Sequence, residues 1–70
     1  MEHNNRIVLT EREKEVVSLA LKGLTNTEIA GHLKISAHTV KAYIERIYRK
    51  FNVHNRVQMT VYAMQNRLGL

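Results

Sequence analysis

The sequence predicts an all-α domain of four helices. Two observations lead to this class: none of the 70 residues is a proline, and apolar residues recur at helical spacing rather than alternating with strand period. A chain of this length forms one small domain, because folding at this size buries only about 60% of the unfolded chain's surface. The resulting thin core leaves little room for an enclosed catalytic pocket.

The first helix is predicted to begin in the segment "LTERE". Thr10 can cap it, because Glu13 follows three positions later and the two residues together form a capping box. Gly23 can take the left-handed conformation that ends many helices. The apolar stripe between these points consists of Val16, Val17, Ala20, Leu21 and Leu24.

The second and third helices are predicted to begin after Thr25 and Ser36. Thr25 starts the segment "TNTE", in which Glu28 can return to the capping amide, and this short helix ends near Leu33. Ser36 is a preferred residue type for the N-cap of the third helix. The face of the third helix that we expect in the core carries Val40, Ile44, Ile47 and Phe51.

The fourth helix is predicted to begin after Asn55, which can cap it. We expect its core stripe to be Val57, Val61, Met64 and Leu68. The opposite side would then carry Met59, Tyr62, Ala63 and Asn66. A patch with apolar side chains opposite the core indicates contact with a partner. The segment 1–7 is expected to be flexible.

The second and third helices are separated only by "KIS". Two helices joined by so short a turn can cross steeply and leave the second one protruding, which is the helix-turn-helix geometry. We place this motif at about residues 26–45. Apolar residues stand where the helices meet, and the small side chain of Ala30 lets them approach closely, whereas Lys34 occupies the turn position that is often glycine. An inert bundle of four helices is the alternative.

The net charge of +5 is unevenly distributed. Residues 1–28 hold four basic and five acidic side chains, a net charge of −1, and residues 29–70 hold seven basic and one acidic, a net charge of +6. A surplus confined to one part of a small domain indicates a face that binds a polyanion. A basic surface that only confers solubility is the alternative.

The composition argues against several other classes of protein. The absence of cysteine excludes disulfides, thiolate zinc sites and thiol catalysis. The histidines His3, His32, His38 and His54 lack zinc-finger spacing, and no nucleophile–base pair or glycine-rich phosphate loop indicates an enzyme. We therefore expect no catalytic residues, no metal and no cofactor. Since no signal peptide or membrane span is recognisable, we expect a cytoplasmic protein associated with the nucleoid rather than with a membrane.

Four landmarks in register, "LTERE", "GLTNTEIA", "L-I-S-TVK" and "RKFNV-NR", resemble the DNA-binding domain of LuxR-type transcription regulators, also called the NarL/FixJ or GerE type. The resemblance covers about residues 8–68, so we assign 8–70 to this domain. Tyr43 and Phe51 depart from the histidine and leucine that are usual there. In the family the domain usually follows a receiver or ligand-sensing domain. The sequence shows neither of these, so the chain resembles either a stand-alone regulator or an excised C-terminal domain.

The resemblance implies that the third helix enters the major groove while the second lies across the DNA backbone. A helical wheel puts His38, Lys41, Ala42, Glu45 and Arg49 opposite the core, with Thr39, Arg46 and Lys50 beside them. Family precedent assigns base-edge contacts to the positions of Lys41, Ala42 and Glu45. The residues at helix starts, where amides favour phosphate, are Thr25, Asn26, Ser36 and Thr39. The expected phosphate clamps are Arg46, Arg49 and Lys50.

Glu45 is the one acidic residue on this basic face, and two interpretations of it remain open. A carboxylate accepts but cannot donate, so it can read the amino group of cytosine in the major groove. Its spacing from Lys41 and Arg49 also fits a ladder of i, i+4 ion pairs, worth about 0.2–0.5 kcal/mol each.

The function predicted is sequence-specific binding of double-stranded DNA in transcription regulation. The resemblance implies that the last helix, about residues 55–68, makes a two-fold dimer contact, and we expect a weak homodimer in solution, completed on an inverted repeat. RNA polymerase is a further candidate partner. The alternatives are a sigma-factor region-4-like domain and a helical protein-interaction module that antagonises a full-length regulator.

Overall fold

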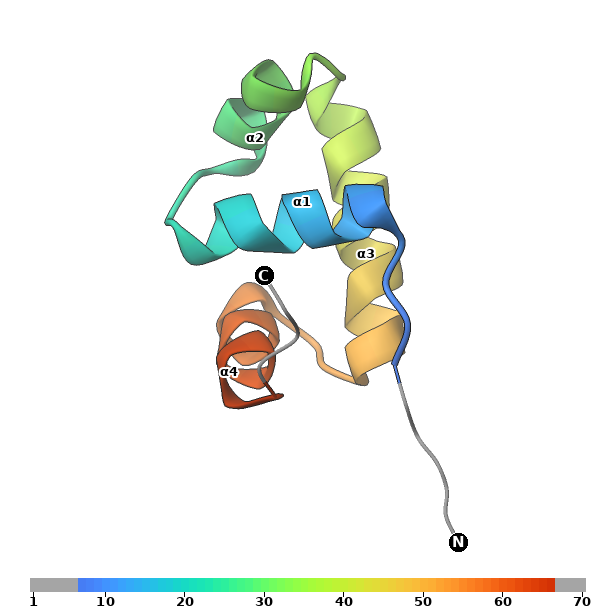
Figure 1. The fold of residues 1–70 in the computed structure, drawn as a ribbon. Coiled ribbons are helices and arrows are strands. Elements are labelled where there is room, and N and C mark those ends of the chain that lie inside the picture. Colours follow the sequence, from blue (N-terminus) through green and yellow to red (C-terminus); the bar gives the residue numbers. More distant parts are fainter. Residues whose placement is uncertain (1–6, 67–70) are drawn as a thin grey trace, which may run out of the picture.

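The computed structural model describes residues 7–66, which form four α-helices and no strand. In chain order these are α1 (Glu11–Leu21), α2 (Asn26–Leu33), α3 (Ala37–Phe51) and α4 (Arg56–Asn66) (Figure 1). The all-α class with four helices is therefore confirmed. The flexible segment predicted for residues 1–7, except Ile7, and the position of Leu68 lie outside the described residues.

Each of the predicted helix starts is confirmed. Thr10 forms a capping box with Glu13: its hydroxyl accepts from the Glu13 amide at 3.1 Å, and its own amide donates to Glu13 Oε1 at 2.8 Å. The same reciprocal pair joins Thr25 and Glu28. The Ser36 hydroxyl accepts from the Thr39 amide at 3.0 Å, and the Asn55 side-chain oxygen Oδ1 accepts from the Gln58 amide at 2.9 Å.

The turn between α2 and α3 depends on one residue in the left-handed conformation. Lys34 has φ 61° and ψ 42°, and the amide of Ile35 donates to the Ala30 carbonyl at 3.0 Å. This conformation costs a residue with a Cβ roughly 1–2 kcal/mol, which is why glycine is common there. The turn reverses the chain so that α3 projects away from α2 (Figure 1), which confirms the predicted helix-turn-helix.

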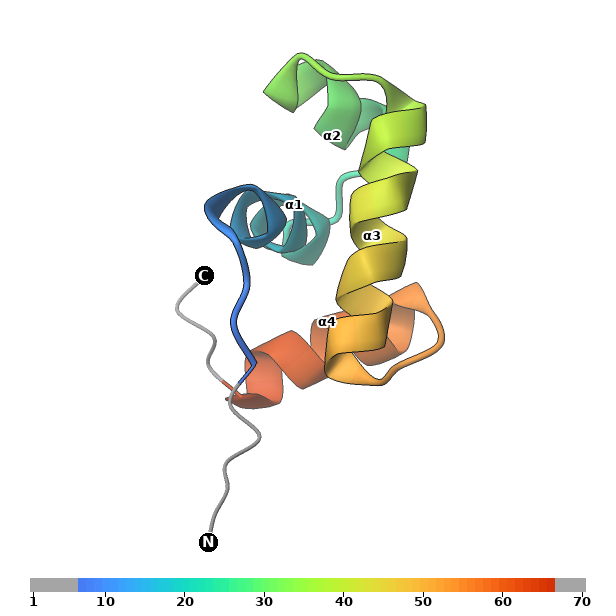
Figure 2. The same cartoon turned by 90° about the vertical axis from the view of Figure 1, so that its right-hand side faces the viewer.

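The core lies where α1 crosses α3, between α2 at one end and α4 at the other (Figure 2). Its buried apolar residues are Leu9, Val16, Val17, Leu19, Ala20, Ile29, Ala30, Val40, Ile44, Ile47, Phe51, Met59 and Ala63. The predicted inner face of α3 is therefore confirmed, since all four of its members are in this set.

The two faces of α4 are the reverse of the prediction. Three residues expected in the core, Val57, Val61 and Met64, are 70%, 39% and 63% exposed. Met59 and Ala63, expected on the outer patch, are 0% and 2% exposed. Both sides of this helix carry apolar side chains, so periodicity alone could not select the buried one.

Contacts with distant residues fix the rotation of α4. The ring of Tyr62 stacks on Phe51 at the end of α3, with centroids 4.5 Å apart. At the start of α4, the Arg56 guanidinium donates to Asn26 Oδ1 and to the Leu24 carbonyl. Both contacts turn the Met59 and Ala63 side of the helix inward.

Candidate nucleic-acid interface

The outward face of α3 carries the largest group of predicted site residues that lie together in the structure. His38, Lys41, Ala42, Glu45 and Arg49 are all exposed, as the helical wheel predicts. Figure 2 looks onto the side of α3 that no other described helix covers. The inner stripe of this helix is packed against α1, α2 and α4, so the helix presents a fixed ridge rather than a mobile segment.

The charges on this ridge are not arranged as the ion-pair ladder predicts. Within the described chain, the structure contains no ion pair between Glu45 and either Lys41 or Arg49. The ladder interpretation is therefore wrong for this structure. The Glu45 carboxylate remains exposed among the basic side chains of the helix.

The side chains of the residues at the helix starts are already engaged in hydrogen bonds within the domain. The hydroxyls of Thr25 and Ser36 each accept a hydrogen bond from a backbone amide, and the side-chain hydroxyl oxygens of Ser36 and Thr39 are 2.8 Å apart. Asn26 is half-buried and accepts from Arg56 at 3.2 Å. These side chains organise the first turns of α2 and α3, where backbone amides and the positive end of the helix dipole favour an anion.

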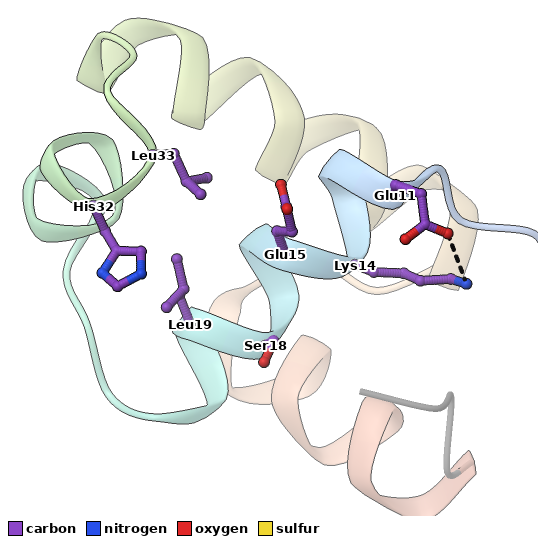
Figure 3. A pocket seen from close by; sticks show the side chains of 7 residues that line it. All are labelled: Glu11, Lys14, Glu15, Ser18, Leu19, His32 and Leu33. Atoms are coloured by element: carbon purple, nitrogen blue, oxygen red, sulfur yellow. Dashed lines mark hydrogen bonds and ion pairs between the residues drawn. The ribbon is translucent and has the colours of Figure 1, made fainter.

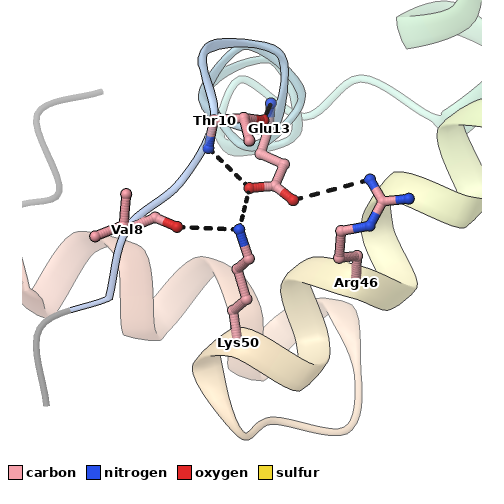
Figure 4. Close-up of polar contacts among 5 residues, drawn as sticks. All are labelled: Val8, Thr10, Glu13, Arg46 and Lys50. Atoms are coloured by element: carbon pink, nitrogen blue, oxygen red, sulfur yellow. Dashed lines mark hydrogen bonds and ion pairs between the residues drawn. The ribbon is translucent and has the colours of Figure 1, made fainter.

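The three predicted phosphate clamps differ in their surroundings. Arg49 is exposed. The side chain of Arg46 is 49% exposed, with its guanidinium 5.3 Å from the centre of the Tyr43 ring and 3.9 Å from Glu13 Oε2. The ammonium group of Lys50 donates to Glu13 Oε1 at 2.7 Å and to the Val8 carbonyl at 3.0 Å (Figure 4).

Glu13 is the one fully buried charged residue in the described part of the chain. Burial raises the pKa of its carboxyl group, but the hydrogen bonds from Lys50 and the Thr10 amide, together with the Lys50 charge, outweigh that effect, so the pKa lies below its ordinary value of 4.5. Glu13 is therefore an ionised group inside the domain, and Lys50 is its counter-ion.

Glu13 was predicted from the sequence as a capping residue, and its second role as a buried anion was not predicted. A signal was present, because Glu13 precedes Val16 and Val17 by three and four positions and so lies on the buried stripe of α1. Arg56 was not singled out at all, although it ties α4 to Leu24, between α1 and α2, and to Asn26 at the start of α2. Burial raises the pKa of Tyr48 nearby, and the positive charge of Arg56 counteracts part of that rise.

A hollow lies between α1 and α2, away from the ridge residues of α3. Figure 3 shows His32 and Leu33 facing Ser18 and Leu19 across it, with the ion pair of 3.4 Å between Lys14 and Glu11 at one end. In residues 7–66 no three histidine, aspartate or glutamate side chains gather closely enough to hold a metal ion. None of the described helices is long and apolar enough to cross a membrane.

Comparison with known proteins gives matches over nearly the whole chain. The family model described as bacterial regulatory proteins, luxR family, matches residues 7–63. The nitrate/nitrite response regulator protein NarP of Escherichia coli (strain K12) is 47% identical over 60 residues, which are 86% of this chain and 28% of NarP. The first curated relatives are matched over only 28–31% of their length.

Two solved structures show the same fold. The VqmA dimer of Vibrio cholerae, a LuxR-type receptor, superposes with a TM-score of 0.87 at 30% identity, over 94% of this chain and 30% of VqmA. The transcription factor GerE superposes with a TM-score of 0.78 at 34% identity, over 91% of this chain and 92% of GerE.

Proposed function

This chain belongs to the luxR family of bacterial regulatory proteins, and we propose that it recognises specific sequences in double-stranded DNA, with α3 in the major groove. The family's members are DNA-binding transcription regulators, and the described relatives include a response regulator and a transcription factor. The proposed function requires no cofactor and no chemical step. It places the protein at the nucleoid, where RNA polymerase is a further candidate partner.

The observation that carries this proposal is the exposed basic ridge of α3, held out from the core by the turn at Lys34. An α-helix fits the major groove, and base edges there present distinct patterns of donors and acceptors. Lys41 can donate to guanine O6 and N7, the Ala42 methyl group can contact a thymine methyl, and Glu45 can accept from the cytosine amino group. These three residues span little more than one turn in the middle of α3.

The remaining residues of the interface orient the helix on the backbone. Arg46 and Arg49 are exposed cations on α3 that suit phosphate contact. The first turns of α2 and α3, capped by Thr25 and Ser36, offer backbone amides to a phosphate. The other residues proposed to contact the DNA backbone are His38, Thr39 and Asn26. Phosphate contacts fix the register of the helix but carry no sequence information, which is left to the base-reading residues.

The same proposal includes a weak homodimer formed through α4. We assign the dimer contact to the exposed stripe of Val57, Val61 and Met64 instead of the predicted patch, because Met59 and Ala63 are buried within the monomer. Tyr62 and Asn66 remain partly or fully accessible beside this stripe. Because three side chains make only a small surface, the dimer is weak in solution. It forms fully on DNA, on an inverted repeat whose half-site centres lie about 10 base pairs apart. The structural relative VqmA is itself a dimer.

Selection of binding sites from random duplexes, followed by a salt titration on the selected site, tests the proposal. We expect an enriched inverted repeat and an affinity that falls steeply with salt, because phosphate contacts release counterions. Failure to enrich any duplex would overturn the proposal and favour the alternative of a module that antagonises a full-length regulator through α4.

A further inference from the structure

The Glu13 carboxylate lies between α1 and α3 with its two oxygens in different situations (Figure 4). Oε1 accepts from the Thr10 amide at 2.8 Å and from Lys50 Nζ at 2.7 Å. Oε2 is buried and accepts no hydrogen bond from the described residues, and the nearest cation is Arg46, 3.9 Å away. One carboxylate thus faces two basic residues of the helix that we propose to enter the groove.

The two cations are held to different degrees. Lys50 makes two hydrogen bonds, one of them with a buried charge, and its side chain is 32% exposed. Moving its ammonium group to a phosphate would leave the Glu13 carboxylate buried with a single hydrogen bond, which is strongly unfavourable. Arg46 is beyond hydrogen-bond distance of Glu13 and 49% exposed, so it can turn to a phosphate at little cost.

From this geometry we infer that Glu13 is a positioning residue for DNA binding: it retains Lys50 as an internal counter-ion and thereby removes that lysine from the set of phosphate contacts. The inference rests on the proposed function. Its consequence is that α3 contacts the backbone through Arg46 and Arg49, and that Glu13 lowers affinity for DNA of any sequence. Base reading by residues nearer the start of α3 then contributes a larger share of the total binding.

Salt dependence measures the number of phosphate contacts directly, with a logarithmic slope of about 0.9 for each contact on duplex DNA. We would measure it on the selected site and on an unrelated duplex, at a temperature where circular dichroism shows every variant folded. Lys50→Met should leave the slope unchanged, whereas Arg49→Met should flatten it by about 0.9. Glu13→Gln keeps an acceptor for the capping box and frees Lys50, so it should steepen the slope by about 0.9.

The double variant Glu13→Gln/Lys50→Met separates positioning from general stability. Its slope should return to that of the unaltered protein, because the released lysine is no longer present. Between 50 mM and 200 mM salt, the extra contact should make the loss of affinity of Glu13→Gln about 3.5-fold larger than that of the unaltered protein, on either duplex. A slope that flattens in Lys50→Met as much as in Arg49→Met overturns the inference, and that comparison suffices even if Glu13→Gln does not fold.

A failure of the proposed function looks different. In that case the unaltered protein would bind neither duplex, and no variant would have a slope to compare.

Discussion

The ring of Tyr62 stacks on the ring of Phe51 with centroids 4.5 Å apart and an interplanar angle of 26°. This contact joins the end of α3 to the middle of α4 and brings Met59 and Ala63 into the core. It also leaves Val57, Val61 and Met64 facing outward. The stack therefore connects the stability of the monomer with the identity of the surface available to a second copy.

The two methionines of α4 provide a direct test of its orientation. Met59 is fully buried, so Met59→Ala should lower the free energy of unfolding by about 2–5 kcal/mol through lost burial and the cavity left behind. Met64→Ala is the matched control, and because that side chain is 63% exposed the change should stay within about 0.5 kcal/mol. Urea denaturation measures both. Equal losses would mean that the helix faces the core differently.

The outer stripe of α4 should matter for assembly and not for folding. Val57→Glu introduces a charge into the proposed dimer contact, so cooperative binding to the inverted repeat should weaken while affinity for a single half-site is retained. Val8→Glu is the control, since both valines are 70% exposed and only Val57 lies on α4. Electrophoretic mobility shifts on full and half sites give the two affinities. Similar effects of the two substitutions would argue against the α4 contact.

Glu45 should act on base discrimination and hardly at all on stability. Because it forms no ion pair with Lys41 or Arg49 in the described chain, Glu45→Ala should change the free energy of unfolding by less than about 0.5 kcal/mol. On DNA, it should lose about 1–3 kcal/mol of preference for cytosine at one position. Four duplexes that differ only at that base pair decide the matter. An unchanged ranking of the four would rule out base reading by Glu45.

The stability of the domain should depend on the charge of Glu13 in acid. Its pKa is lowered by folding, so the ionised form stabilises the native state above the ordinary value of 4.5, and that contribution is lost as the pH falls through the lower native pKa. Glu13→Gln removes hydrogen bonds to a charged group and should cost about 1.5–3 kcal/mol at pH 7.

The difference in unfolding free energy between the unaltered protein and Glu13→Gln should shrink as the pH is lowered from 7 to 3. Chemical denaturation at a series of pH values gives this difference. Glu15→Gln alters an exposed carboxylate on the same helix and serves as the control. A difference that stays constant across this range would mean that the charge of Glu13 is not what stabilises the fold.

The sequence by itself determined the features that depend on residues a few positions apart. The capping boxes at Thr10 and Thr25 join residues three apart, and the inner face of α3 follows from helical period alone. The position of the short turn at Lys34 followed from the distance between two helices that were each recognisable locally, whereas its left-handed conformation was seen only in the structure. These features predicted the fold class and the exposed ridge of α3, because backbone hydrogen bonding and helix periodicity act over one or two turns.

Only the tertiary structure decided which face of α4 is buried and what neutralises Glu13. The Glu13–Lys50 hydrogen bond spans 37 positions and the Arg56–Asn26 bond spans 30. Both stripes of α4 are apolar enough to enter a core, so the choice between them depends on the shape left by α1 and α3 and on the Phe51 ring that Tyr62 meets. A buried carboxylate likewise requires a cation, but which lysine supplies it depends on how two helices cross, and local periodicity does not encode that crossing.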